Sequence, residues 1–538
     1  MKPTLTEYPR RMSPTAWFGA RPSWVTHQPS WVATVTLLLL IALPLRAPSF
    51  AVTGLDWDES LYVIIAQRWM QGGLPYVAVW DQHPVGLPAL LAVATWLVGD
   101  GLLAARIACL LAVVGTAVLL YAFLARSGHA PLAGLVAATF YPFYMNRPDG
   151  LAANTEVFNN LVVTAASYLL LGEILAGARR VRPGVMFASG LLLGIGLQFK
   201  YVVLPEAVLF CGAVLYKLLR DGGTLSRTVW LALLAMTGGL LPTGLATIYF
   251  WQAGALTAYL DANLRANAVY LDAPLTTATT LARLRFGLLP LIALLPWPMV
   301  LLALFRDRRI RNCYAMLGGW LALWLIAACL DVAAPLKLWK HYFNALIPPL
   351  CVIAGLTVEL LVDRAGRRQW LFGGLVFVVL APAVALMIKH AGNSYAIDRT
   401  NVPRAIADFI GRNGSNGHDI YVFNYDPLLY AYARAVPPTR FVLSIELSEF
   451  SGSSGAQPAI VISRILAEAP HWIVIAEPSP YAFTGAVWHE LATALRSYRV
   501  AATYDETDYI QPPIRVLVYE NRQLSSDDDP PEPASGNG

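Results

Sequence analysis

Long apolar runs dominate the chain between residues 31 and 390. A membrane-spanning helix needs about 20 consecutive, mostly apolar residues. The pattern therefore predicts eleven spans, at approximately 31–50, 102–125, 130–146, 156–177, 184–199, 201–219, 228–251, 285–305, 313–330, 342–362 and 370–389. A further apolar stretch, 85–98, is too short for a comfortable crossing, and we expect it to form a re-entrant or interfacial helix.

The basic residues between these runs indicate the orientation of the chain, because cytoplasmic loops carry an excess of Lys and Arg. If the N-terminus is cytoplasmic and 85–98 does not cross, every cytoplasmic loop holds basic residues: Arg126; Arg179, Arg180 and Arg182; Lys217, Arg220 and Arg227; Arg306, Arg308, Arg309 and Arg311; Arg364, Arg367 and Arg368. We therefore expect a multi-pass membrane protein with a cytoplasmic N-terminus, a long first outer loop at 51–101 and an extracytoplasmic C-terminal part.

The polar C-terminal part has a different pattern. Short β-type runs alternate with helical stretches; the runs begin at Asp419, His471 and Ile514, and the helices cover about 402–412, 458–469 and 484–497. We predict a small extracytoplasmic α/β domain at 391–522, following an α-helical transmembrane domain at 31–390. The two ends, 1–30 and 523–538, are predicted to be a flexible cytoplasmic leader and a disordered, acidic, Pro-rich tail.

Composition narrows the class of protein further. Of the 538 residues, 57% are hydrophobic and 14% charged, which excludes a disordered chain and argues against an ordinary soluble enzyme. The net charge of +5 is small and no basic stripe carries interleaved aromatic residues, so we expect no nucleic-acid partner. The five cysteines lie in or beside apolar runs, which disfavours a disulfide framework or a zinc site.

The first outer loop carries the most informative residues. Asp56, Asp58 and Glu59 follow the first span directly, and the next stretch places Tyr62 and Trp69 on one broad apolar face. That helix is expected to lie in the membrane interface. A carboxylate there can act as a general base toward an acceptor hydroxyl, or it can cap the helix; the two roles are compatible. Asp56 and Asp58 also form an Asp-x-Asp pair that can hold a divalent ion, but such pairs are common by chance, and we expect no metal and no other cofactor.

Other ionisable residues lie at the outer ends of the predicted spans. Arg106 is near the start of the second span, Glu156 opens the fourth, Lys200 occupies a tight turn, and Lys340 and His341 precede the tenth span. Ionisable groups at membrane depth are costly and favour a functional interpretation. The cations are positioned to converge on one phosphate, although snorkelling side chains explain some of them equally well.

Several of these residues stand in an order that resembles a known group. The order is Asp58-Glu59 before Tyr62, then Gly72-Gly-Leu-Pro-Tyr, Asp81-Gln-His-Pro, Gly99-Asp-Gly with Arg106, and Lys340-His-Tyr-Phe before Pro348-Pro. It is similar to the GT-C fold membrane glycosyltransferases, and within them to the family of protein O-mannosyltransferases and aminoarabinose transferases of lipid A. The resemblance covers roughly residues 30–390.

The resemblance implies a sugar donor linked to polyprenyl phosphate and inversion at the anomeric carbon. It also implies that Asp58 is the catalytic base with Glu59 beside it, that Glu156 is a second acidic residue, and that Lys200 and Arg106 lie near the donor phosphate. His83 stands where some relatives have Lys, and we include it in the expected phosphate site with Lys340 and His341. The expected partners are the donor, membrane lipid and a lipid, glycan or protein acceptor.

Two other functions are compatible with the pattern. A transporter or lipid flippase would more often have inverted repeats and charges near the bilayer midplane, whereas the charges here cluster at the outer ends of the spans. A membrane scaffold that binds a partner through its outer domain would leave the acidic first loop unexplained. The outer α/β domain favours a bacterial inner membrane.

Overall fold

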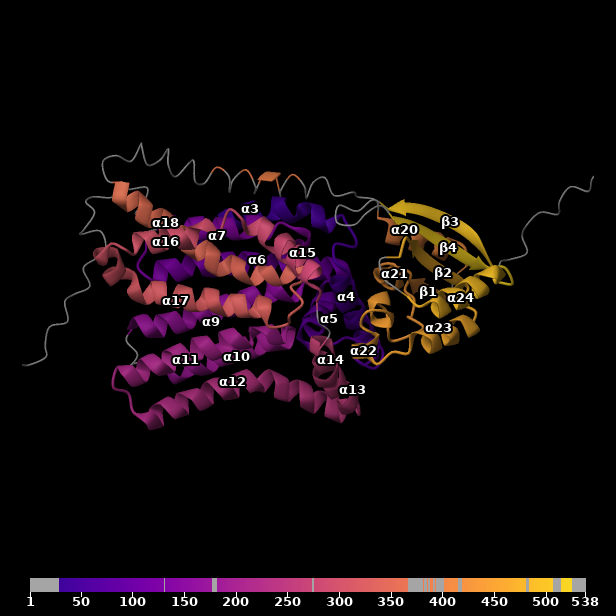
Figure 1. The fold of residues 1–538 in the computed structure, drawn as a ribbon, viewed down its shortest axis with the longest axis horizontal. Coiled ribbons are helices and arrows are strands. Elements are labelled where there is room, and N and C mark those ends of the chain that lie inside the picture. Colours follow the sequence, from indigo (N-terminus) through magenta and orange to yellow (C-terminus); the bar gives the residue numbers. More distant parts are fainter. Residues whose placement is uncertain are drawn as a thin grey trace, which may run out of the picture.

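The structure is a computed structural model, shown in Figure 1. It describes residues 29–129, 131–176, 181–272, 275–365, 401–414, 419–479, 483–506 and 514–524, with the single positions 381, 385, 388, 389 and 392. Most of the predicted span at 370–389 lies outside the described residues. The same holds for the predicted leader up to residue 28 and for the predicted tail from residue 525.

A helical bundle makes up the larger part of the molecule, and the C-terminal part lies at one end of it (Figure 1). This end is called the domain-facing end below. The helices of the bundle and its connections are α3 Trp31–Arg46, α4 Trp57–Met70, α5 Gly86–Val98, α6 Gly101–Arg126, α7 Pro131–Tyr144, α8 Pro148–Leu151, α9 Thr155–Ala176, α10 Pro183–Phe199, α11 Leu204–Arg220, α12 Leu225–Gln252, α13 Leu256–Leu260, α14 Ala266–Asp272, α15 Thr277–Leu288, α16 Pro296–Leu304, α17 Arg308–Ala333 and α18 Ile347–Ala365.

The prediction of an α-helical polytopic membrane protein is confirmed. Within the described ranges, seven helices are long and apolar enough to cross a membrane, or eight if one bent pair counts as a single span. The bent pair corrects the predicted straight span at 285–305, because Thr277–Leu291 and Pro296–Leu304 meet at 62°. Pro290, in the last turn before the bend, has no amide hydrogen to continue the first helix, and Pro296 opens the second.

Two predicted spans form helices that are shorter than a full crossing usually requires. The run at 130–146 forms α7, which has 14 residues, and the run at 184–199 forms α10, which has 17.

α10 packs closely against α12 through small residues. A Cβ on Gly190 would lie 2.1 Å from the carbonyl oxygen of Ala235, and one on Gly194 would lie 2.3 Å from that of Gly239. Glycine therefore permits a backbone approach that dispersion forces stabilise inside a membrane bundle.

The first long connection of the bundle carries α4 and α5. The stretch 85–98 forms α5, a helix of 13 residues that packs on α4 and α6, in agreement with its short apolar pattern. Residues 59–66 of α4 are all buried, so protein covers the face of this helix that was expected to meet the membrane interface. Tyr62 is 1% exposed and meets the His83 ring edge to face at 5.8 Å between centroids. The C-terminal part covers this face of α4, and the sequence pattern of α4 alone does not reveal that cover.

The C-terminal part is an α/β unit, as predicted. Its four-stranded sheet has the order β1-β2-β4-β3, with β1 parallel to β2 and the other pairs antiparallel. Its elements are α20 Val402–Arg412, β1 Ile420–Phe423, α21 Leu428–Tyr432, α22 Ser451–Ser454, α23 Pro458–Ala467, β2 Trp472–Glu477, α24 Gly485–Ala494, β3 Tyr498–Glu506 and β4 Ile514–Asn521. β3 was not predicted, because most of its residues are exposed or half-buried and an irregularity between Val500 and Ala502 interrupts its alternation.

Candidate active site

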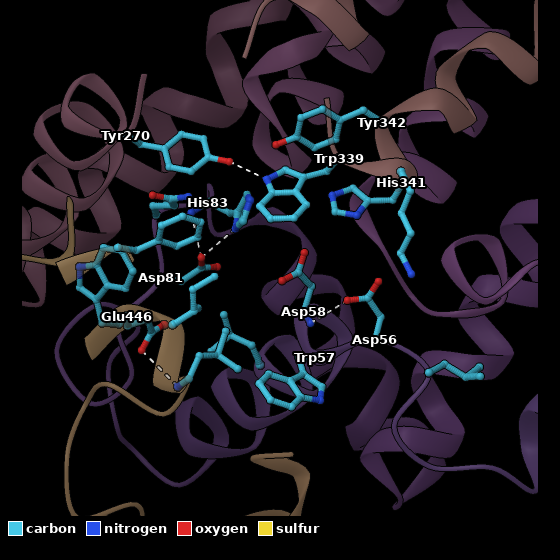
Figure 2. Close-up of a pocket in the computed structure, with 18 of the residues that line it drawn as sticks. Asp56, Trp57, Asp58, Asp81, His83, Tyr270, Trp339, His341, Tyr342 and Glu446 are labelled. Atoms are coloured by element: carbon cyan, nitrogen blue, oxygen red, sulfur yellow. Dashed lines mark hydrogen bonds and ion pairs between the residues drawn. The ribbon is translucent and has the colours of Figure 1, made fainter. Parts of the chain in front are cut away.

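A cavity of about 250 Å³ opens where the bundle meets the C-terminal part. Figure 2 shows labelled side chains from several segments arranged around it. The lining comes from the start of α4, the segment before α5, α14, the turn before α18 and the segment 443–450 of the C-terminal part. Segments far apart in sequence therefore build one enclosure, and only the folded chain brings them together.

Asp58 projects into this cavity from the first turn of α4 (Figure 2). The preceding Asp56 is the N-cap, and its Oδ1 accepts a hydrogen bond from the Asp58 amide at 3.1 Å. Such a cap fixes the direction of the first turn, and the structure assigns this capping role to Asp56 and not to Asp58. Burial, and then the negative charge of Asp56, raise the pKa of Asp58 against the lowering effect of His341, His83 and Lys200. A carboxylate with a raised pKa is a stronger proton acceptor.

Glu59, the neighbour of Asp58, does not line the cavity and is buried in an ion pair with Arg106. Its Oε2 lies 2.5 Å from Nη2 of Arg106, and both side chains are 1% exposed. Its Oε1 accepts a hydrogen bond from the Ala153 amide at 2.7 Å. Arg106 therefore pairs with Glu59 and does not line this cavity, and its expected place near the donor phosphate stays a prediction. The sequence could not anticipate this, because a phosphate and a buried carboxylate are equally suitable partners for arginine.

The Glu59–Arg106 pair belongs to a buried polar network that supports α4. Arg46 of α3 donates to the carbonyl oxygens of Gly150 and Leu151 at 2.7 and 2.8 Å. Asn154, in the same connection, donates to Oδ2 of Asp56 at 3.1 Å. The network joins α3, α6 and the segment before α9 to the N-terminus of α4. It therefore positions the helix turn that carries Asp58.

Lys200 and Glu156 form a second buried pair, just outside the cavity lining. Nζ of Lys200 lies 2.7 Å from Oε1 of Glu156 and 4.0 Å from the centre of the Tyr342 ring. Tyr342 lines the cavity, and neither member of the pair does. The pair therefore stands behind Tyr342, and Glu156 balances most of the charge of Lys200. Neither residue lines this cavity, but Glu156 lines a smaller neighbouring cavity that Tyr342 also borders.

Three of the expected basic residues do line the cavity. They are His83, Lys340 and His341. Nδ1 of His83 is 2.8 Å from Oδ1 of Asp81. Burial lowers the pKa of His83, but the charge and hydrogen bond of Asp81 outweigh burial and raise it. Nζ of Lys340 is 3.1 Å from Asp149 and its side chain is 40% exposed, so it can reorient toward an incoming anion.

An aromatic wall, which the sequence analysis missed, lies beside these residues. Trp339 donates through Nε1 to the Tyr270 hydroxyl at 2.8 Å, and both rings line the cavity (Figure 2). Arg283 lies over the Trp339 ring at 3.6 Å, and Lys337 lies over the Tyr270 ring at 4.7 Å. Cations stacked on aromatic faces keep their charge close to the site.

The backbone on both sides of Lys337 adopts an uncommon conformation. Leu336 and Leu338 have φ values of 54° and 50°, in the left-handed region that is unfavourable for residues other than glycine. Arg283 donates to the Lys337 carbonyl oxygen at 2.7 Å and so holds the segment in place. Backbone conformations of this kind persist where surrounding contacts enforce them, often at functional sites.

The opposite side of the cavity is rich in buried acceptor atoms. Oδ2 of Asp81, Oε1 of Gln82 and Oε1 of Glu446 are buried without a hydrogen-bond partner among the described residues. Glu446 comes from the C-terminal part, and Figure 2 shows it across the cavity from Asp58. Burial raises the pKa of Glu446 well above its ordinary value. Buried polar atoms without partners are costly, so this side suits a ligand that carries hydroxyl groups.

Two solved structures share the architecture that holds this cavity. The ArnT structure from Cupriavidus metallidurans, bound to undecaprenyl phosphate, is 15% identical and superposes with a TM-score of 0.57 over 91% of this chain and 97% of that chain. The archaeal oligosaccharyltransferase AglB from Archaeoglobus fulgidus, in complex with an inhibitory peptide and a dolichol-phosphate, is 12% identical, with a TM-score of 0.51 over 93% of this chain and 75% of that chain. The protein has the GT-C fold.

One sequence comparison covers part of this GT-C chain. Residues 82–251 match the model of the family described as dolichyl-phosphate-mannose-protein mannosyltransferase. The matched segment begins beside His83 and includes Arg106, Glu156 and Lys200. Among curated protein sequences, none matches the chain.

The part of the GT-C chain that the structure describes contains no group of three or more His, Cys, Asp or Glu residues placed to hold a metal ion. Asp56 and Asp58 both line the cavity, and Asp56 also accepts hydrogen bonds from the Asp58 amide and from Asn154.

Proposed function

We propose that the protein transfers a sugar from a polyprenyl-phosphate donor to an acceptor hydroxyl, with inversion at the anomeric carbon and Asp58 as general base. The observation that carries this proposal is the position of Asp58, which faces one cavity with Lys340, His341 and His83 in a GT-C fold. The two structural neighbours are described with undecaprenyl phosphate and dolichol-phosphate bound, which supports a polyprenyl-phosphate donor.

The reaction balances with the groups at hand. The acceptor oxygen forms a bond to the anomeric carbon while the bond from that carbon to the phosphate oxygen breaks. The hydroxyl proton passes to Asp58, and the bonding electron pair leaves with the polyprenyl phosphate. Negative charge grows on the leaving phosphate in the transition state, so fixed cations close to it lower the barrier. Lys340, His341 and protonated His83 are the lining residues suited to that role.

The acceptor-rich side supports a substrate with several hydroxyl groups. Glu446→Leu is expected to raise the KM for the sugar substrate about 2- to 10-fold, because one buried hydrogen bond contributes roughly 0.5–1.5 kcal/mol. Glu446→Gln keeps the backbone bond that Leu443 donates to this side chain at 3.3 Å, and it should remain near wild type. Steady-state kinetics of the three proteins test this. An unchanged KM in the Leu variant would place the substrate elsewhere.

The acid side of the pH profile is expected to report the raised pKa of Asp58. The base works only when deprotonated, so kcat/KM should fall as the pH drops through a value above the ordinary 3.8. Asp56→Asn removes the neighbouring charge that raises this pKa, while Asn still caps a helix. The acid limb of this variant should therefore move to lower pH. A limb that stays in place would argue against Asp58 as the titrating group.

The distribution of basic loops supports a cytoplasmic N-terminus and an extracytoplasmic C-terminal part. In a chain whose exposed Cys313 and Cys329 are replaced by Ala, Arg496→Cys should react with a thiol reagent that cannot cross the membrane. Arg309→Cys should react only after the membrane is opened. Labelling of intact spheroplasts provides the measurement, and the reverse pattern would overturn the orientation.

The function itself is tested by incubating membranes that contain the protein with a set of labelled polyprenyl-phosphate sugars. Label should move from one of these donors to an acceptor, and the same membranes carrying Asp58→Asn provide the control. Absence of transfer from every donor tested, with native acceptors present, would refute the proposal.

A further inference from the structure

A second cavity, of about 570 Å³, lies nearer the C-terminal end of α4 than the cavity that Asp58 faces, which is called the active cavity. It is lined by the C-terminal half of α4, the turn between α5 and α6, α20 and the segment of α21 that continues to Ala435. The two cavities share no lining residue. This second cavity is called the arginine cavity below.

Three arginines from three separate elements line the arginine cavity. They are Arg68 of α4, Arg404 of α20 and Arg434, which follows α21. In the described ranges, none of them forms an ion pair with a carboxylate. Arg68 donates to Oε1 of Gln71 at 2.7 Å, and the Arg404 guanidinium lies 5.4 Å from the centre of the Tyr432 ring. Like charges gathered around one hollow repel each other, and a bound anion relieves that repulsion.

The acidic residue that lines the arginine cavity already has a structural task. Asp100 is the N-cap of α6, and its Oδ1 accepts a hydrogen bond from the Leu103 amide at 2.8 Å. The lining thus carries three positive charges against one negative charge. An anion is the ligand that this balance favours, and arginine binds phosphate through two parallel hydrogen bonds.

The position of the arginine cavity points to a lipid as the source of that phosphate. It lies where α6, a candidate membrane span, begins at the domain-facing end. Met70, which lines the cavity, is 48% exposed, and Trp96 and Leu97, which follow the lining residue Thr95, are 75% and 70% exposed. Exposed apolar residues with a tryptophan at the end of a span are typical of the membrane interface. Arginines at this depth meet the headgroups of the leaflet.

We propose that the arginine cavity binds the phosphate of an anionic membrane lipid. The site is independent of the transfer reaction, because it uses none of the residues of the active cavity. By contacting Arg68 together with Arg404 and Arg434, the headgroup ties α4 of the bundle to the C-terminal part. The same helix, α4, carries Asp58 at its other end.

The test compares full-length proteins purified in a neutral detergent and titrated with phosphatidylglycerol, phosphatidylcholine or inorganic phosphate. Bound lipid is counted by native mass spectrometry. Wild type is expected to bind phosphatidylglycerol at least about 10-fold more tightly than the variant with Arg68→Gln, Arg404→Gln and Arg434→Gln, because each basic residue near a lipid headgroup contributes measurably. A matched control carries Arg412→Gln, Arg464→Gln and Arg496→Gln, three exposed positions outside the cavity. It should bind like wild type.

Three outcomes would overturn the proposal. One is equal binding of phosphatidylglycerol by wild type and the cavity variant, and another is equal binding of the two lipids by wild type. A third is tight binding of inorganic phosphate without preference for the lipid, which would assign the site to a soluble phosphate. If the Gln variant fails to fold, the Lys variant at the same three positions keeps the charge and should retain most of the binding. Loss of binding in a folded Lys variant would also count against the phosphate site.

Discussion

Asp58→Asn is expected to slow sugar transfer by about 10²- to 10⁴-fold, the usual contribution of a general base. Asn has nearly the same shape as Asp but cannot accept the proton of the acceptor hydroxyl. The fold should not change, because the cap of α4 is Asp56 and the buried network is built on Glu59 and Asn154. Transfer from a labelled donor by purified protein is the measurement.

Two controls make the Asp58→Asn result specific. Asp408→Asn removes a charge from an exposed position of α20 and should leave the rate unchanged. The melting temperature of Asp58→Asn should stay near that of wild type, because this substitution breaks no ion pair in the described structure. A variant that is well folded and still turns over within a few-fold of wild type would remove Asp58 from the mechanism.

Arg106→Met is expected to lower the free energy of unfolding by about 3–5 kcal/mol, because it leaves the carboxylate of Glu59 buried without its charge partner. The double variant Glu59→Gln, Arg106→Met removes both charges and should recover much of that loss, since replacing a whole buried pair is far less costly than breaking it. Unfolding of the purified variants in detergent, followed by circular dichroism, measures both values.

The Arg106 variants also separate two interpretations of this residue. If Arg106 bound the donor phosphate, Arg106→Met would raise the KM for the donor and leave stability unchanged. The structure predicts the opposite: a large loss of stability, with donor KM close to wild type in the stabilised double variant. Arg496→Met, at an exposed position, is the matched control and should alter neither quantity.

Local patterns in the sequence were sufficient for most of the fold. The predicted spans at 102–125 and 156–177 correspond to α6 and α9, because continuous apolar runs need no tertiary information to be recognised. The strands β1 and β2 were found for the same reason, since their buried residues form unbroken apolar runs. β3 was missed because an exposed strand carries few apolar residues in regular alternation.

The candidate site could be predicted only in part. The acidic first loop indicated Asp58, and the basic residues at the span ends indicated Lys340 and His341. Pairing depends on tertiary structure, and the sequence therefore could not tell that Arg106 meets Glu59 rather than a ligand. Glu446 gave no signal in the sequence, because a single Glu in a polar domain resembles a surface residue. Only the fold buries it, in the lining of the cavity that Asp58 and Asp81 also line.

We propose that this chain breaks the bond between a sugar and a polyprenyl phosphate. Purified protein in liposomes that contain the labelled donor and an acceptor provides the most direct test. We expect free polyprenyl phosphate to appear in step with glycosylated acceptor, and the new glycosidic bond to have the inverted anomeric configuration. If intact donor moves between the leaflets and no polyprenyl phosphate is released, sugar transfer is refuted and the result favours a flippase.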